Sequence, residues 1–137
     1  MKNIITILVL LISISVFSQS NQELLSHYQK YYKQMQSQSD IQGVINALTH
    51  LNILSPNQAR TDTLATLYMN EGRHVEALNT IGIEKNEADS DLAVQVKAFS
   101  LKAINDIDQS LIHYEELFKR KPNPFIAYEL AEMKIRK

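Results

Sequence analysis

The sequence predicts an all-α protein built from a repeated pair of helices, which is an α-solenoid. Small residues recur at intervals of 33 residues, at Ala65, Ala98 and Ala131. Within each period the apolar residues follow helical spacing, and no useful length of chain shows the strict alternation of a strand. Glycine is scarce, at 3 residues of 137. A period of this length is typical of one supersecondary unit stacked on copies of itself, so we expect about three antiparallel helix pairs followed by a terminal helix.

The first 18 residues have the layout of a secretory signal peptide. Lys2 supplies a positive charge, and residues 4–17 form an uncharged run of Ile, Leu, Val, Phe, Ser and Thr. We expect cleavage after Ser18, which leaves residues 19–137 as a helical repeat domain in the periplasm or outside the cell. The alternative is an uncleaved membrane anchor, but this run is shorter than the roughly 20 apolar residues that a bilayer requires.

Composition excludes several classes of protein. The chain has no cysteine, so it has no thiol for a lipoprotein anchor and none for a disulfide. Its formal net charge of −1 at pH 7 is too balanced for a nucleic-acid binder, which would carry a strongly basic face. Acidic residues gather at Glu84, Glu87, Asp89 and Asp91, while basic residues crowd the C-terminal end. We interpret both runs as solvated faces.

The helices can be placed in order along the chain. We expect them at residues 22–36, 40–53, 57–70, 74–83, 90–104, 107–120 and 123–136. Gly72 suits the left-handed conformation that ends a helix, whereas Pro122 and Pro124 stop the sixth helix because proline cannot continue a helix interior. The short connections make each helix antiparallel to the one before it.

These residues resemble the tetratricopeptide repeat family over nearly all of the chain after residue 18. That family places a large apolar residue, a small residue, an aromatic, a second small residue after the turn, and a closing proline. In the second helix pair the matching residues are Leu64, Ala65, Tyr68, Gly72 and Ala77. In the third pair they are Ala98, Leu101, Ile107, Ser110, Tyr114 and Pro122. The small residues are expected where the two helices of a pair cross closely.

The chain departs from the family pattern at the end of the second pair. Glu84 and Asp89 stand where an apolar residue and the proline are expected, and Gly82 interrupts the second helix of that pair. A glycine inside a helix costs roughly 1 kcal/mol relative to alanine. We therefore predict that the connection at residues 82–90 is the loosest in the stack.

The resemblance also implies a binding surface, because first helices of the pairs line the concave wall in this family. The residues at the corresponding positions are Gln29, Lys33, Gln36, Asp62, Thr66, Met69, Gln95, Phe99, Lys102 and Tyr128, followed by Glu132 and Ile135. Most are polar and a few are apolar or aromatic, which suits a protein or peptide segment held by side-chain hydrogen bonds and one or two anchors. The expected function is therefore an exported scaffold that binds a protein partner.

Catalytic and metal motifs do not emerge from the sequence. His27, His50, His74 and His113 share no metal-ligand spacing, and there is no nucleophile motif or glycine-rich phosphate loop. We expect no enzymatic activity, no cofactor, no metal, no nucleic-acid partner and no stable membrane insertion once the signal peptide is removed. Two alternatives stay open: the N-terminal part of a longer repeat protein acting in envelope assembly or secretion, and a small enzyme with an unrecognised site.

Overall fold

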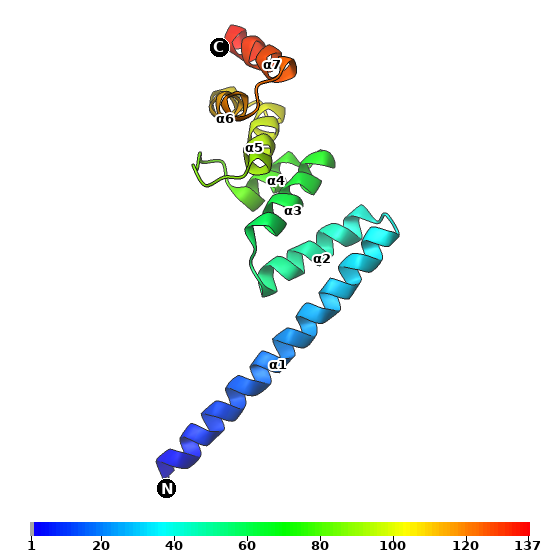
Figure 1. Cartoon of the computed structure of the whole chain (residues 1–137), viewed down its shortest axis with the longest axis vertical. Coiled ribbons are helices and arrows are strands. Elements are labelled where there is room, and N and C mark those ends of the chain that lie inside the picture. The colour runs from blue at the N-terminus through cyan, green and yellow to red at the C-terminus, as the bar shows by residue number, and fades with distance from the viewer. Residues whose placement is uncertain (1) are drawn as a thin grey trace. The chain divides into compact units, whose positions relative to one another are not determined.

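The computed structural model describes the backbone of residues 2–137 and the side chains from Ser18 onward (Figure 1). Over this part the protein consists of seven α-helices and contains no strand, as the periodicity predicts. The chain divides into two compact units, Met1–Pro56 and Asn57–Lys137. Each unit is described by itself below.

The first unit is a helical hairpin of α1 (Lys2–Ser37) and α2 (Ile41–Leu54). The helix predicted at residues 22–36 is the C-terminal part of α1, which continues through the predicted cleavage point without a break. The side chains of the predicted signal peptide lie outside the described part, apart from Ser18. Between the helices Ser39 adopts a positive φ of 55°, and the carboxylate of Asp40 caps α2 by accepting a hydrogen bond from the Gly43 amide.

The two helices of this hairpin approach closely at Gly43. A Cβ atom at that position would collide with the side chain of Met35, which would have to move to admit a larger residue. The ring of Tyr28 stacks on that of His50, with 4.4 Å between the ring centroids. In the described part of this unit the buried hydrophobic residues are Met35, Val44, Ile45, Ala47, Leu48 and Leu51.

The second unit contains five helices whose bounds lie within two residues of the predicted ones. They are α3 (Gln58–Asn70), α4 (His74–Ile81), α5 (Asp91–Ala103), α6 (Ile107–Arg120) and α7 (Pro124–Arg136). Each helix packs against the next one in the chain, and α3 also packs against α5. Contacts that run from neighbour to neighbour are compatible with an α-solenoid.

Side-chain caps begin four of these five helices. Asn57, Ser90, Asp106 and Asn123 each accept a hydrogen bond from the backbone N–H three residues later. Such a cap satisfies one of the amides that a helix start leaves unpaired and typically contributes about 1 kcal/mol. The helix starts are thus decided by local sequence.

The prediction that Gly82 lies inside a helix is wrong. α4 ends at Ile81, and Gly82 follows it with φ 78° and ψ 173°, a region of backbone space that is essentially restricted to glycine. Gly82 therefore terminates the helix, two residues earlier than expected, and redirects the chain into the connection to α5.

Small residues occupy the helix crossings in two of the three predicted places. Ala65 and Ala77 are fully buried and pack together with Val96. Ala98 is also fully buried, and its carbonyl accepts a hydrogen bond of 2.8 Å from the Ser110 hydroxyl. Ala131 differs, because it is exposed on α7.

The acidic run is a solvated face only in part: Glu84 and Glu87 are exposed, whereas the carboxylates of Asp89 and Asp91 are paired with basic groups. The side chain of Lys97 is only 2% exposed, and its ammonium donates to the Glu84 carbonyl at 2.8 Å and to the Asp89 carboxylate at 2.6 Å. Arg120 donates to the Asp89 carbonyl at 2.7 Å, and the ring of His113 lies 2.7 Å from the Ile83 carbonyl. The connection predicted to be the loosest is thus held to α5 and α6 at Ile83, Glu84 and Asp89, while residues 85–88 are exposed.

Further ion pairs join the same connection to α6. Glu116 accepts hydrogen bonds from Arg120 at 2.8 Å and pairs with Lys85 at 3.0 Å. The Arg120 guanidinium and then the Lys85 ammonium lower the pKa of Glu116 to about 2. Asp91 pairs with Lys121 at 3.0 Å, and this pairing lowers the pKa of Asp91. Acidic and basic runs far apart in the sequence therefore neutralise one another within the second unit.

Candidate functional site

Three of the predicted contact residues belong to the first unit. Gln29, Lys33 and Gln36 are exposed on α1, and the Gln36 amide donates a hydrogen bond of 2.7 Å to the Tyr32 hydroxyl. The other nine residues of the predicted surface lie in the second unit.

Asp62 is a structural residue and requires a correction. Its side chain is 4% exposed, and its two carboxylate oxygens accept hydrogen bonds from Gln58 at 2.8 Å and from the Ser90 hydroxyl at 2.6 Å. Because Ser90 also caps α5, Asp62 connects α3 to the start of α5. Because both oxygens are bonded within the second unit and little of the residue is exposed, Asp62 is poorly placed to contact a partner.

Two neighbours of Asp62 on α3 are also partly withdrawn from solvent. The Thr66 hydroxyl donates to the Asp62 carbonyl at 2.8 Å, as β-hydroxyl side chains commonly do within a helix. Met69 packs against the cluster of Ala65, Ala77 and Val96. Neither side chain projects freely, so the α3 part of the predicted surface is the weakest.

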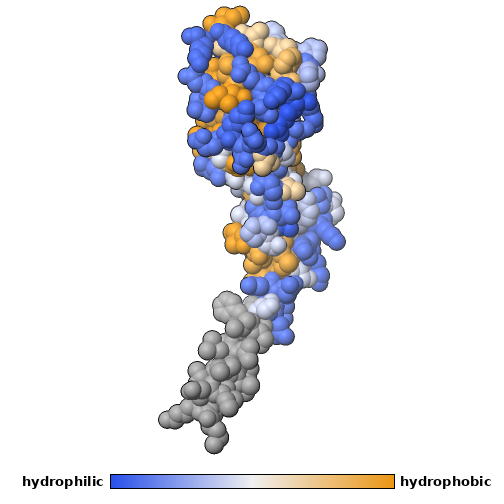
Figure 2. All heavy atoms as spheres, turned by 60° about the vertical axis from the view of Figure 1, so that its left-hand side comes forward, coloured by the Kyte–Doolittle hydropathy of each residue, from blue (hydrophilic) through white to orange (hydrophobic). Residues whose placement is uncertain are grey.

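The α5 residues Gln95 and Phe99 line a groove of about 300 Å³ formed with α6 and α7. The full set of lining residues is Gln95, Phe99, Leu117, Lys121, Asn123, Phe125 and Ile126. We refer to it as the aromatic groove. On one face of the second unit Figure 2 shows apolar patches lying between hydrophilic side chains, which is the kind of surface that receives apolar anchors of a partner.

The aromatic rings of Phe99 and Phe125 line part of this groove. Phe99 stacks on the buried ring of Tyr114, with 5.5 Å between centroids, and meets Phe125 edge-on at 6.2 Å. Phe125 is 57% exposed although it lies at the start of a well-packed helix. Two large rings fixed by their neighbours, one of them open to solvent, provide a preorganised apolar anchor site.

Phe125 was absent from the predicted set, although a sequence signal could have found it. It precedes Tyr128 by three residues, so it continues on α7 the same helical stripe that contains Tyr128, Glu132 and Ile135. Tyr128 and Ile135 are 67% and 86% exposed. The α7 part of the predicted surface is therefore the most accessible part.

The predicted contact residue Lys102 forms ion pairs with carboxylates of α7. Its ammonium pairs with Glu129 and, at 3.2 Å, with Glu132. Partial burial disfavours the charged ammonium, but the hydrogen bonds to the two carboxylates outweigh it and raise the pKa of Lys102. Nearby, burial and then the negative charge of Glu129 raise the pKa of the Tyr114 phenol. This polar cluster holds α5 and α7 together beside the aromatic groove.

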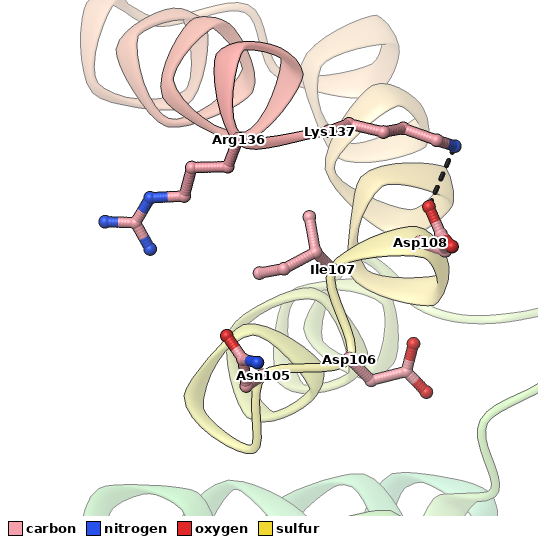
Figure 3. Close-up of a pocket in the computed structure, with 6 residues that line it drawn as sticks. All are labelled: Asn105, Asp106, Ile107, Asp108, Arg136 and Lys137. Atoms are coloured by element: carbon pink, nitrogen blue, oxygen red, sulfur yellow. Dashed lines mark ion pairs between the residues drawn. The ribbon is translucent and has the colours of Figure 1, made fainter.

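A second, more polar recess of about 340 Å³ lies at the other end of α7 (Figure 3). Figure 3 shows Arg136 and Lys137 facing the turn at Asn105 and Asp106, with Ile107 between them. Its charged groups already have internal roles, since Asp106 caps α6 and Lys137 pairs with Asp108 at 2.8 Å. The aromatic groove is therefore the better candidate for binding.

The described part of the chain contains no group of three or more His, Cys, Asp or Glu side chains placed to hold a metal ion. Of the helices in that part, none combines the length and the apolar character needed to cross a bilayer. Among known proteins, no family model matches the sequence. Nor does the sequence match any curated protein significantly.

Proposed function

We propose that this protein is a non-enzymatic helical-repeat scaffold, of tetratricopeptide-like arrangement, that binds a protein or peptide partner at the aromatic groove. The single observation that carries the proposal is the exposed Phe125 ring beside Phe99 in a groove of about 300 Å³. An exposed aromatic in a hollow lined by further apolar residues is the usual form of an interface hot spot.

The tetratricopeptide-like arrangement is supported by the order of helix contacts. α3 packs against both α4 and α5, as the first helix of one repeat packs on the first helix of the next. The small residues Ala65 and Ala98 lie at close helix crossings. The connection between α4 and α5 differs from the family pattern, because Lys97 pairs with the Asp89 carboxylate and Arg120 donates to the Asp89 carbonyl where apolar contacts are expected.

The groove favours a particular kind of ligand segment. Phe99, Leu117, Phe125 and Ile126 offer apolar contact, while the Gln95 amide and the Lys121 ammonium lie on the lining as polar groups. The best match is a segment with one large apolar or aromatic anchor and a neighbouring hydrogen-bonding or acidic group.

We further propose that the protein works after export, with Gln19 as its first residue. Mass spectrometry of the mature N-terminus tests this point, and an intact Met1 would contradict it.

Selection from a random peptide library displayed on phage tests the binding proposal. Residues 19–137 serve as bait, and selected peptides are measured against Phe125→Glu and, as the matched control, Ile112→Glu, which changes an exposed apolar residue of α6 outside the groove. We expect peptides with a shared apolar anchor whose affinity falls at least tenfold on Phe125→Glu and stays unchanged on Ile112→Glu. Peptides that bind all three proteins equally, or no enrichment at all, would contradict the proposal.

A further inference from the structure

The ring of His113 on α6 is buried against the connection between α4 and α5. None of its surface is exposed, and its Nε2 atom lies 2.7 Å from the carbonyl oxygen of Ile83. A carbonyl oxygen only accepts hydrogen bonds, so Nε2 must carry a proton and donate it. This contact therefore assigns the tautomer of the ring and joins α6 to the start of the connection.

The other ring nitrogen of His113 has no hydrogen-bond partner in the protein. Among the side chains that the structure describes, Nδ1 is a buried polar atom that no protein group satisfies. In the neutral ring Nδ1 is an unused acceptor, whereas in the protonated ring it is a charged donor without an acceptor. A buried charged group without a partner costs more free energy than a neutral one. The closed connection therefore suits only the neutral imidazole.

The charges around the ring include a second buried cation. Lys97 of α5 faces the ring, as do Asp89 and Lys85 of the connection. The Asp89 carboxylate is already paired with the Lys97 ammonium at 2.6 Å. Burial, opposed by the hydrogen bond to Ile83 and supported by the charge of Lys97, lowers the pKa of His113. A proton on the buried ring would therefore add a positive charge beside one that is already neutralised.

The remaining charged groups on α6 have partners of their own. The Arg120 guanidinium and then the Lys85 ammonium lower the pKa of Glu116 to about 2, so Glu116 stays ionised at any pH considered below. Toward α7 the ion pairs of α6 are Glu115 with Lys134 and Asp108 with Lys137. Histidine is the side chain whose ordinary pKa lies between pH 7 and 5. A change of the connection in this range therefore points to His113.

The connection can open without unfolding a helix. It lies outside the helices, between the end of α4 at Ile81 and the start of α5 at Asp91 (Figure 1). Residues 85–88 are exposed, and Gly82, with a positive φ of 78°, is a flexible point at which the loop can turn. Segments with few buried apolar contacts open locally at a low cost in free energy.

We propose that His113 is a pH-sensitive switch that opens the connection between α4 and α5 in mildly acidic solution. At neutral pH the neutral ring donates to the Ile83 carbonyl and the connection is closed. When Nδ1 takes up a proton, residues 83–89 separate from α5 and α6, and water reaches the imidazolium and the Lys97 ammonium. The helices stay folded. The switch is independent of the aromatic groove and of export.

NMR of the proposed mature chain, residues 19–137, tests the switch in the unchanged protein. Nitrogen-15 spectra of the histidine rings should show His113 with its proton on Nε2 at pH 7. Between pH 7 and 5 the His113 ring and the amides of residues 83–89 should change with one midpoint, while the signals of α7 stay in place. These changes should be reversible.

Amide hydrogen exchange separates opening from a change of charge alone. The Asn86 and Asp89 amides donate hydrogen bonds within the loop. The open form takes up the proton more readily than the closed form, so the open fraction rises as pH falls. After correction for the intrinsic effect of pH on exchange, protection of these two amides should fall by up to about tenfold per pH unit below about pH 6.5.

Two substitutions assign the response to one ring. His113→Gln keeps a side-chain amide that can donate to the Ile83 carbonyl but does not titrate, so protection of residues 83–89 should no longer depend on pH between 7 and 5. The matched control is His74→Gln, at the other histidine of the second unit, whose ring lies 3.3 Å from the Ser100 hydroxyl. This control should keep the full pH response.

Four results would overturn the inference. The first is a proton on Nδ1 of His113 at pH 7. The second is a ring that titrates while protection of residues 83–89 stays constant. The third is a pH response that persists in His113→Gln, because a carboxylate such as Asp89 would then be its cause. The fourth is loss of the native signals of α5 and α6 over the same pH range, because the protein would then unfold as a whole.

Discussion

Replacing Lys97 by methionine is expected to release the connection between α4 and α5. Lys97 is almost completely buried, and its ammonium is bonded to the Glu84 carbonyl at 2.8 Å and to the Asp89 carboxylate at 2.6 Å. Methionine fills a similar volume but donates no hydrogen bond. The variant therefore leaves a carbonyl and a carboxylate without this donor while it preserves most of the packing.

The magnitude follows from the burial of the pair. Removing one partner of a buried ion pair costs about 3–5 kcal/mol, and one hydrogen bond to a charged group contributes about 1.5–3 kcal/mol. The Asp89 side chain is 12% exposed, and its loop can turn toward water, which lowers the cost. We expect Lys97→Met to reduce the free energy of unfolding of the second unit by about 2–4 kcal/mol.

Chemical denaturation and amide hydrogen exchange together check this prediction. The double variant Lys97→Met/Asp89→Asn should recover about half of the loss, because it removes the unpaired carboxylate along with the ammonium. Amides of residues 84–90 should exchange much faster in the single variant, while those of α7 change little. A loss below about 0.5 kcal/mol with unchanged exchange in that loop would refute the view that Lys97 secures it.

The remaining predictions concern single substitutions. Gly82→Ala should destabilise the protein by about 1–3 kcal/mol, because Gly82 has a backbone conformation that only glycine adopts readily; an unchanged urea midpoint would contradict this. Ala98→Leu should cost about 1–3 kcal/mol through overpacking, whereas Ala131→Leu, on an exposed surface, should stay within about 0.5 kcal/mol; equal midpoints for the two variants would show that the repeat register is misassigned. Burial, followed by the positive charge of Lys97, lowers the pKa of His113. As pH falls, the imidazole is therefore protonated in the unfolded chain before it is protonated in the folded protein. The free energy of unfolding should then decrease below about pH 6.5, by at most about 1.4 kcal/mol per pH unit. His113→Gln should flatten the stability curve between pH 7 and 5, and a curve as steep as that of the unchanged protein would exclude His113 as its cause.

The helices were predictable from the sequence because their signals are local. Asn57, Ser90, Asp106 and Asn123 are capping residues placed directly before helical apolar spacing, and Pro124 follows the stop of α6. Capping and periodicity act within a few residues, so they can be recognised without knowing any tertiary contact. Gly82 was misplaced because a glycine fits both a helix interior and a helix end, and the sequence pattern does not distinguish them.

Candidate site residues could be predicted from the sequence only where their place on a helix face indicates that they are exposed. Gln95, Phe99 and Tyr128 were found by counting from the small residues, and the structure places the first two in one groove. Asp62 was misassigned because the same counting cannot show that Ser90, far away in the sequence, donates to its carboxylate. Phe125 was missed because the counting stopped one turn short of the start of α7.

Periodicity and side-chain size were enough to predict the helical class, the order of the helices and the close crossings at Ala65 and Ala98. Tertiary structure decided the partners of the charged residues. Lys97 stands in register with Leu64 and Leu130, which marks it as unusual but does not name Asp89 and Glu84 as its partners. The structure was also needed to show that Ala131 is exposed while Ala98 is buried. The physical reason is that the energies of ion pairs and of burial depend on distance in space, and many different separations along the chain can bring two groups together.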